Sequence, residues 1–312
     1  MRKHLICLFL LLSLLLTSCS APRPSDGGEE KYVLTDDIGR IVTTPDQPHR
    51  VACLLGSFAD LWQLAGGEVV ATTSDAFDTF SLSEDGVVNL GGAHSPSLEK
   101  LLSADPDLVI ASASTASHLS MRQTLEQLSI PIVYFDMDNF EDYLFALERC
   151  TRITERPDLY LQNGLALQES ISHLKEEYRK QNFKKEKRIL LLRASSTGVK
   201  VKGSTGTILG EMLLDFGTEN IADLDTSLLE GLSLESILAL EPYHIFVVTM
   251  GNDSDLALGV FDRLVSDHPA WASLMAVREG RVHMMDKTLF HQKPNARYLT
   301  SYETLYDILT AQ

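Results

Sequence analysis

The chain has 312 residues, enough for one large domain or two of ordinary size, and 44% of them are hydrophobic. Charged residues make up 22%, an ordinary globular balance that excludes a disordered or fibrous chain. Acidic residues outnumber basic ones 43 to 27, for a formal charge of −16. Because a surface that binds nucleic acid needs an excess of Lys and Arg, this composition excludes nucleic acid as a partner.

The N-terminus has the pattern of an export signal. Arg2, Lys3 and His4 precede a leucine-rich apolar run at 5–16, which is too short for a membrane span of about 20 residues. We interpret residues 1–18 as a signal peptide. The small residues before Cys19 resemble the bacterial lipobox, which implies cleavage before Cys19 and a diacylglycerol on its thiol. The alternative is an ordinary secretory signal with an incidental cysteine.

Residues 19–31 contain Pro, Gly, Ser and charged residues but no large apolar side chain. This composition predicts a flexible tether. The mature protein would then be held on the extracytoplasmic face of the cell membrane by its acyl chains rather than by its charge.

Two further cysteines lie in the main body of the chain. Cys53 and Cys150 could form a disulfide in an exported protein, but two buried free thiols are the simpler expectation. Neither belongs to a CxxC motif, so no zinc or redox motif is predicted.

Short apolar runs alternate with helical stretches along the chain, a pattern that predicts parallel sheets covered by helices. Several runs are apolar at every position, as expected of strands buried on both faces. A small hairpin is predicted at 36–42, with Gly39 in its turn. The predicted strands are 51–55, 69–72, 108–111, 132–135, 188–192, 245–249 and 282–285.

One long amphipathic helix is predicted between the two halves, over 158–181. Pro157 suits its first turn, and Tyr160, Leu167, Ile171, Leu174 and Tyr178 fall on one stripe. A single stiff helix permits little hinge motion, so we expect a largely preformed cleft between the halves.

The two halves also resemble each other. Residues 97–110 can be laid on 233–246 at an offset of 136 without a gap. Each copy begins with Ser-Leu-Glu at the start of a short helix and continues through a Pro-marked turn into a buried strand. We therefore predict two Rossmann-like α/β lobes, 32–154 and 184–312, joined by a linking helix at 155–183.

Familiar catalytic motifs are missing from the sequence. It contains no GxSxG, no HExxH and no Walker GxxxxGK[ST] motif, and its nine His residues form no HxH pair. A triad assembled in space stays open, but nothing in the sequence points to one. We expect the protein not to be an enzyme.

Several motifs occur in an order that is typical of one family. They include Asp-Ile-Gly-Arg at 37–40, Leu-Gly-Gly at 90–92, the two Ser-Leu-Glu triplets, Pro-Ala-Trp at 269–271 and Val-Arg-Glu-Gly-Arg-Val at 277–282. From about residue 33 onward, the chain resembles the substrate-binding proteins of ABC importers for ferric siderophores, haem and cobalamin. The resemblance implies a class III periplasmic binding protein architecture and an ABC permease dimer as partner. It also implies no permanently bound cofactor, and a ligand that is an iron complex or cobalamin.

The resemblance assigns a role to the two Ser-Leu-Glu triplets. In that family a Glu on each lobe docks against Arg pockets of the two permease subunits, and Glu99 and Glu235 match those positions. Two carboxylates on separate rigid lobes would set the register on a two-fold partner. The simpler alternative is that each acid only complements its own helix N-terminus.

Ligand contacts are predicted from topology, because ligands of open parallel sheets bind outside the carboxyl ends of the strands. This edge gives the candidates Ser57, Phe58, Asp75, Ser114, His118, Arg193 and Met250. The stretch 290–298 resembles a recurrent segment of iron-complex binders and adds His291, Lys293 and Arg297.

Two of these candidates suggest the chemistry of the ligand. Lys293 and Arg297 are cations in an acidic chain. An anionic ligand would explain their presence, and ordinary surface charge would explain it equally well. His118 or His291 could ligate haem iron, although a single His in a loop is more often a loop residue without a ligand role.

Three other functions stay open at this point. A receptor for free zinc or manganese would need three or four His, Asp or Glu side chains converging in the cleft. A membrane-tethered hydrolase would need a nucleophile and base within hydrogen-bond reach. A signalling or structural lipoprotein would have a groove filled by apolar side chains. The sequence does not choose among siderophore, haem and cobalamin, nor between a Gram-positive and a Gram-negative host.

Overall fold

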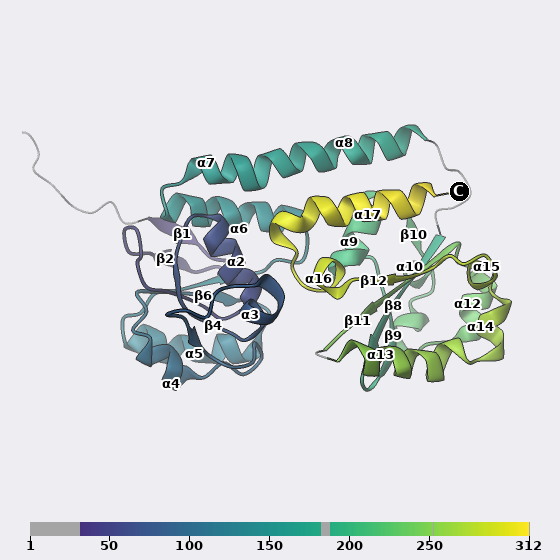
Figure 1. Cartoon of the computed structure of the whole chain (residues 1–312), viewed down its shortest axis with the longest axis horizontal. Helices are drawn as coiled ribbons and strands as arrows, with labels where there is room; N and C mark the ends of the chain where they lie inside the picture. Colours follow the sequence, from purple (N-terminus) through teal and green to yellow (C-terminus); the bar gives the residue numbers. More distant parts are fainter. Residues whose placement is uncertain (1–31, 182–187, 252, 312) are drawn as a thin grey trace, which may run out of the picture. The chain divides into compact units, whose positions relative to one another are not determined.

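The computed structural model describes residues 32–181, 188–251 and 253–311 (Figure 1). The predicted signal peptide 1–18, the predicted lipidation site Cys19 and the tether up to residue 31 lie outside the described residues, as do the last two residues of the predicted linking segment 155–183. Within the described ranges, no helix combines the length and the apolar character needed to cross a bilayer.

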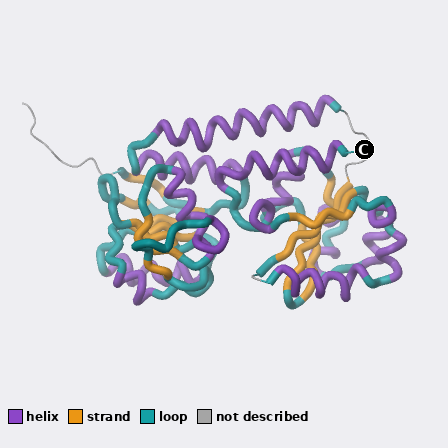
Figure 2. The backbone as a smooth tube through the Cα atoms, viewed as in Figure 1, coloured by secondary structure: helices purple, strands orange, loops and turns teal. Residues whose placement is uncertain are grey.

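The N-terminal lobe is a five-stranded parallel sheet with helices on both faces (Figure 2). Its strand order is β5-β4-β3-β6-β7, and an antiparallel hairpin of β1 and β2 precedes it. The strands are β1 (Val33–Thr35), β2 (Ile41–Thr43), β3 (Val51–Cys53), β4 (Val69–Thr72), β5 (Val88–Asn89), β6 (Leu108–Ser112) and β7 (Ile132–Phe135). The helices are α2 (Gly56–Leu64), α3 (Asp75–Phe80), α4 (Leu98–Ser103), α5 (Ala116–Gln127) and α6 (Phe140–Ile153).

The C-terminal lobe repeats this plan with one departure. Its sheet has the order β10-β8-β11-β12, all parallel, and β9 pairs antiparallel with β8. Its strands are β8 (Arg188–Ser195), β9 (Gly198–Lys202), β10 (Glu219–Asn220), β11 (His244–Thr249) and β12 (Val282–Met285). Its helical segments are α9 (Ile208–Asp215), α10 (Ile221–Leu224), α11 (Ser227–Glu230), α12 (Leu234–Leu240), α13 (Ser254–Phe261), η2 (Asp262–Ser266), α14 (Pro269–Ser273), α15 (Met275–Arg278), α16 (Lys287–Phe290), η3 (Asn295–Arg297) and α17 (Tyr298–Thr310).

The strands predicted from apolar runs are all present. β8 extends to Ser195, three residues past its predicted end, and the hairpin at the start of the chain turns at Gly39 with φ 81°. The prediction of purely parallel sheets is wrong at β9. This strand carries an alternating Val-Lys-Val-Lys pattern because it is exposed on one face, so it lacks the apolar run by which the other strands were found.

The linking helix is interrupted by a π-turn. It consists of α7 (Pro157–Tyr160), the π-helical turn η1 (Leu161–Leu165) and α8 (Ala166–Lys180). The expectation of one regular helix therefore needs correction at this single wide turn. Within this turn the Asn163 carbonyl accepts a hydrogen bond from the Tyr143 hydroxyl at 2.7 Å. The Asn163 amide donates to the Leu64 carbonyl at the end of α2 at 2.9 Å. The π-turn therefore fastens the linking helix to the N-terminal lobe.

A second connection joins the lobes, which the sequence did not predict. The C-terminal helix α17 packs along α8 (Figure 1). Its Tyr298 ring lies 5.1 Å from the ring of Phe140 in the N-terminal lobe, and its Tyr302 ring lies 5.7 Å from the ring of Phe216 in the C-terminal lobe. Tyr143 and Tyr178 extend these contacts at either end, and we call the six rings the aromatic chain. One apolar core thus includes residues of both sheets.

A buried and a partly buried histidine lie side by side on the C-terminal sheet. His244 on β11 and His283 on β12 bring Nδ1 and Nε2 within 3.0 Å, so one ring donates and the other accepts. Burial, together with the neighbouring His283 and Arg281, lowers the pKa of His244 to about 4. Burial also lowers the pKa of His283. Protonating both rings would break this hydrogen bond and place two charges in the core.

This pair predicts an acid-sensitive fold. Free histidine titrates at about 6.5, so below that pH the unfolded chain binds more protons than the folded protein, and the free energy of unfolding falls as the pH drops towards 4. We expect His244→Gln to make the fall in Tm between pH 7 and pH 4 shallower. His173→Gln, at an exposed position of α8, is the control. Identical pH slopes for wild type and His244→Gln would contradict the prediction.

Candidate functional site

The loops after the N-terminal strands are tied together by Asp75. Its Oδ2 accepts a hydrogen bond from the Gly56 N–H at 2.8 Å, and its Oδ1 accepts from the Thr73 hydroxyl at 2.5 Å. Gly56 leaves no room for a side chain, because a Cβ there would lie 2.4 Å from the backbone nitrogen of Ala76. Asp75 therefore fixes the loops that follow β3 and β4 at the carboxyl edge of the sheet.

Two predicted ligand contacts turn out to be packing residues. The His118 side chain is fully buried, with Nδ1 accepting from the Ser112 N–H at 3.1 Å and Nε2 donating to the Ala93 carbonyl at 2.8 Å. Burial lowers its pKa, which keeps the ring neutral in these roles. Phe58 is also fully buried, edge-on to Phe135. The prediction of direct ligand contact is not met by these two side chains.

The remaining N-terminal candidates and Met250 are spread along the carboxyl edges of the two sheets. Ser57 is buried, and its carbonyl accepts a hydrogen bond from the Asn295 amide at 2.7 Å. Ser114 is exposed in the loop after β6, and Met250 is 40% exposed after β11. Their contact with a ligand stays a prediction.

Four cations, Arg193, Lys202, Lys287 and Lys293, act electrostatically on His291, and we call these five residues the basic cluster. Arg193 lies on β8 and Lys202 on the neighbouring strand β9. Lys287 begins α16, and its ammonium donates to the Gly251 carbonyl at 2.9 Å, which ties together the loops after β11 and β12. Arg193 and the loops after β11 and β12 therefore present positive charge near the carboxyl edge of the C-terminal sheet, while Lys202 pairs in register with Leu191 in the middle of β8.

The cations of the basic cluster repel one another in a partly dry environment. Burial, followed by the four cations, lowers the pKa of His291 to about 4, so this ring is neutral at physiological pH. Burial also lowers the pKa values of Arg193, Lys202 and Lys293. Lys293 is partly compensated by Asp138, whose carboxylate lies 4.0 Å from the ammonium. Such a site favours an anion, which would relieve the repulsion.

The sequence identified Arg193, His291 and Lys293 as candidates but missed Lys202 and Lys287. The signal for Lys202 was present in the alternating pattern of residues 199–202, because period two puts Lys200 and Lys202 on one face of a strand. Lys200 pairs in register with Arg193 on β8. Lys287 had no local signal, since only the pairing of β12 with β11 brings it to this edge.

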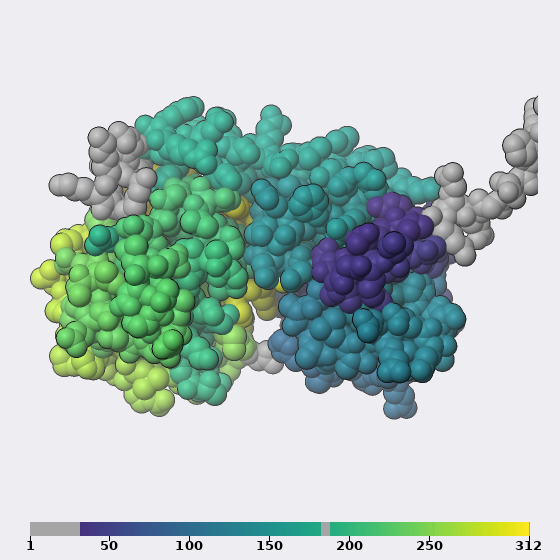
Figure 3. Space-filling view, turned by 180° about the vertical axis from the view of Figure 1, so that it is seen from behind, coloured from purple at the N-terminus to yellow at the C-terminus, as the bar shows by residue number. Residues whose placement is uncertain are grey.

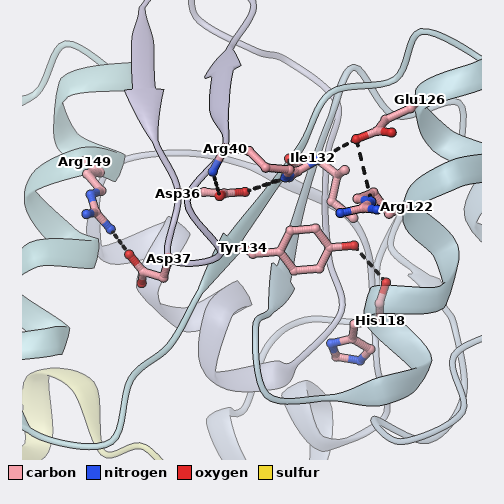
Figure 4. A network of polar contacts seen from close by, with 9 residues as sticks. All are labelled: Asp36, Asp37, Arg40, His118, Arg122, Glu126, Ile132, Tyr134 and Arg149. Carbon is pink, nitrogen blue, oxygen red and sulfur yellow. Dashed lines mark hydrogen bonds and ion pairs between the residues drawn. The ribbon is translucent and has the colours of Figure 1, made fainter.

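The Asp-Ile-Gly-Arg motif supports the N-terminal sheet from its outer edge (Figure 4). The Arg40 guanidinium donates to Asp36 at 2.6 Å, to Glu126 at 2.6 Å and to the Ile132 carbonyl at 2.7 Å. It also lies 5.0 Å from the centre of the Tyr134 ring. The motif therefore clamps the hairpin onto the edge strand β7.

Asp37, the first residue of this motif, contacts the chain just after the carboxyl end of β7. Its carboxylate accepts hydrogen bonds from the Asp136 N–H at 2.8 Å and from Arg149 at 2.5 Å. Asp136 begins the loop that carries Asp138, the partner of Lys293. The Asp-Ile-Gly-Arg motif, which served in the sequence only to indicate the family resemblance, thus positions one wall of the candidate site.

Glu99 and Glu235 occupy equivalent places in the two lobes. Each is exposed at the second residue of a short helix, α4 or α12. The helices are capped alike, since the Ser97 and Ser233 hydroxyls each accept from a backbone N–H three residues on, at 3.3 Å. The strands that follow, β6 and β11, occupy corresponding positions in their sheets, so the repeat seen in the sequence is a repeat of structure.

A cavity of about 320 Å³ lies on the side of the linking helix, between the start of α6 and helices α8, α9 and α17. In the wall of this cavity the Asp215 carboxylate accepts hydrogen bonds from the Tyr302 hydroxyl at 2.6 Å and from the Lys175 ammonium at 3.0 Å. The lobes are separate masses below this helix in the view from behind (Figure 3). The cavity is lined by none of the ligand candidates named from the sequence.

No group of three His, Cys, Asp or Glu side chains that could hold a metal ion is found in residues 32–181, 188–251 and 253–311. Cys53 and Cys150 are free thiols, both buried.

Two α/β lobes joined by a linking helix, with candidate sites at facing sheet edges, define a class III periplasmic binding protein architecture. Residues 51–289 match the family model described as periplasmic binding protein, so the chain belongs to this family. The family consists of substrate-binding proteins rather than enzymes.

Individual relatives agree with this assignment. A Bacillus subtilis protein assigned as the ABC transporter substrate-binding lipoprotein YhfQ is 24% identical over 307 residues, covering 93% of this chain and 92% of its own. Staphylococcus aureus SirA, solved with staphyloferrin B, has a TM-score of 0.70 at 19% identity and covers 90% of this chain and 99% of its own. The periplasmic heme-binding protein RhuT from Roseiflexus sp. RS-1 has a TM-score of 0.67 at 20% identity, with coverages of 84% and 97%. The protein is thus an ABC transporter substrate-binding protein, a role that implies a permease partner and a small-molecule ligand.

Proposed function

We propose that this protein captures an anionic iron chelate outside the cell and delivers it to an ABC permease. The observation that carries the proposal is the basic cluster, in a chain of formal charge −16. Lys287 reaches the Gly251 carbonyl after β11, and Arg193 on β8 lies in register with Lys200 on β9. A ferric siderophore with carboxylate or catecholate donors is the ligand class that this charge suits best. Lys and Arg side chains would pair with its free oxygens.

Haem is the second candidate, because its propionates also suit a basic site. Haem iron further needs an axial ligand. His118 is engaged at both ring nitrogens, which leaves the neutral ring of His291 and the partly exposed thioether of Met250. SirA and RhuT support both candidates as ligand classes for this fold, since one was solved with a siderophore and the other is named for haem. Cobalamin is a weaker candidate, since it lacks a comparable negative charge.

We expect purified protein to bind an anionic ferric siderophore more tightly than haem or cobalamin, with an affinity that falls as salt is raised. Lys202→Gln should weaken that binding about tenfold, equal to about 1.4 kcal/mol. Quenching of tryptophan fluorescence measures the affinities. Lys175→Gln, at a lysine paired with Asp215 beside the linking helix, is the control and should bind normally. Preference for cobalamin, or binding indifferent to salt, would reject the anionic ligand.

We also propose that Cys19 carries a lipid that anchors the protein to the extracytoplasmic face of the membrane. The lipobox-like residues before Cys19 support this, and the relative YhfQ is named a lipoprotein. The residues between Cys19 and the first described strand would leave the lobes free to reach the permease.

Replacing Cys19 by Ala should release the exported protein from the membrane fraction and abolish its labelling by a radioactive fatty acid. Cys7→Ala, inside the predicted signal peptide, should change neither result in the mature protein. Fractionation of cells followed by immunoblotting gives the distribution. A Cys19→Ala protein that stays on the membrane would show that something other than this thiol holds it there.

The permease contact is proposed to run through Glu99 and Glu235. Their equivalent, exposed places on the two lobes support this, because a two-fold permease would meet one carboxylate from each lobe. A favourable interaction between each carboxylate and its own helix N-terminus would account for either Glu alone. It would not require the same exposed position on both lobes.

Charge reversal of both residues, Glu99→Lys with Glu235→Lys, should abolish ligand uptake by cells while ligand affinity stays unchanged. Stability should fall by only about 1–2 kcal/mol, since an acid at a helix N-terminus contributes about 0.3–1 kcal/mol. Asp255→Lys is a matched control, because Asp255 is an exposed acid at the second residue of α13. Full uptake by the double variant would refute docking through these residues.

A further inference from the structure

A fully buried asparagine connects the end of the chain to the N-terminal lobe. Asn295, in the short helix η3, donates from its side-chain amide to the Ser57 carbonyl at 2.7 Å and to the Asp60 carboxylate at 2.8 Å, both on α2. It is 0% exposed, and its backbone has the left-handed φ of 51°. Its Oδ1 has no hydrogen-bond partner among the described residues. A buried polar group in such a conformation is retained only where the contacts around it fix it.

The two cations that flank Asn295 are predicted ligand contacts. Lys293, two residues before it, reaches Asp138 in the loop after β7, with 18% of its side chain exposed. Arg297, two residues after it, lies 5.3 Å from the centre of the Phe80 ring at the end of α3. One of its guanidinium nitrogens is buried without a hydrogen-bond partner among the described residues. Both side chains follow β12 of the C-terminal lobe in the sequence, yet both contact the N-terminal lobe.

We propose that Asn295 is a positioning residue that holds Lys293 and Arg297 against the N-terminal lobe, so that the anion site has a cation from each lobe before the ligand arrives. The inference rests on the proposed function, because it takes the ligand to be anionic. It adds that the segment 293–297 is held by contacts with the N-terminal lobe. Arg193 and Lys202 remain on the C-terminal sheet, so the ligand is held by cations from both sides of the cleft.

The chemistry of the pocket explains why this position needs asparagine. The residue must adopt a positive φ, which Asn tolerates far better than most residues. It must also donate two hydrogen bonds to acceptors, which a carboxylate could not do. Burial raises the pKa of Asp60, while the Asn295 amide and Arg297 oppose that rise. The titratable groups that face Asp60 are Arg297 from the C-terminal segment and Tyr143 from α6.

Asn295→Gly is the direct test, since Gly keeps the positive φ and removes the side-chain amide that donates to Ser57 and Asp60. With ferric citrate as the anionic probe, we expect at least a tenfold loss of affinity at low salt and a shallower dependence of affinity on salt. Lys293→Gln and Arg297→Gln should lower the affinity less when they are added to Asn295→Gly than when they are made in the wild-type protein. The reason is that Asn295 acts through these two cations. A purely structural role would leave the salt dependence unchanged and the losses additive.

A conservative variant supplies a second, independent readout. Asn295→Asp puts a carboxyl group against Asp60, and such a pair needs a shared proton to hydrogen-bond. Its affinity relative to wild type at the same pH should therefore recover as the pH falls from 8 to 5, whereas that of Asn295→Gly should not. Equal pH profiles for the two variants would overturn the proposal.

Asn163→Ala is the matched control for fastening of the lobes. Asn163 donates to the Leu64 carbonyl at the other end of α2, far along the chain from the cleft cations. This variant should retain ferric citrate affinity within twofold. Thermal unfolding of every variant confirms folding before binding is measured.

The outcomes separate this inference from the proposed function. Wild-type protein that binds neither ferric citrate nor an anionic ferric siderophore overturns both. Wild-type binding that Asn295→Gly leaves unchanged in affinity and in salt dependence overturns the role of Asn295 and leaves the proposed function standing.

Discussion

The packing of the C-terminal helix across both lobes is the constraint on which the rest of the structure depends. In the aromatic chain the Phe140 ring lies within 7 Å of both Tyr298 and Tyr302, and the Tyr302 ring lies 5.7 Å from that of Phe216. Rings buried in one continuous core cannot slide apart without exposing that core to water. The two sheets are therefore held at a defined separation by side-chain packing as well as by the linking helix.

This packing determines where the charges of the site lie. The same segment that leads into α17 carries Lys293 and Arg297, and Asn295 joins it to α2. The Asp-Ile-Gly-Arg hairpin holds Asp136 through Asp37, and Asp136 begins the loop that carries Asp138, the partner of Lys293. A site whose walls are fixed in this way would lose little conformational entropy on binding, and the preformed cleft stays a prediction.

The sequence predicted what local pattern can encode. Strands buried on both faces gave continuous apolar runs, and Ser97 and Ser233 gave a helix cap that recurs in the structure at the same place in each lobe. The strand β9 was missed because it is exposed on one face, and the π-turn because its residues are ordinary helix formers apart from Gly164.

The site was predicted less well, for a physical reason. The contact between Asn295 and Ser57 joins residues 238 positions apart, and no local pattern marks such a pair. His118 was proposed as a ligand contact because it follows a strand, whereas burial and two hydrogen bonds give it a packing role. Topology locates the edge of a sheet but does not show which side chains at that edge face outward.

The late position of α17 in the chain has a consequence for biogenesis. A chain is synthesised from its N-terminus, so the N-terminal sheet is complete well before residues 298–310 are made. Until those residues arrive, Phe140 and Tyr143 lack their partners on α17. Chains that end early would therefore lack both the lock between the lobes and the cations beside Asn295. Synthesis must therefore pass Tyr302 before α17 can contact both lobes.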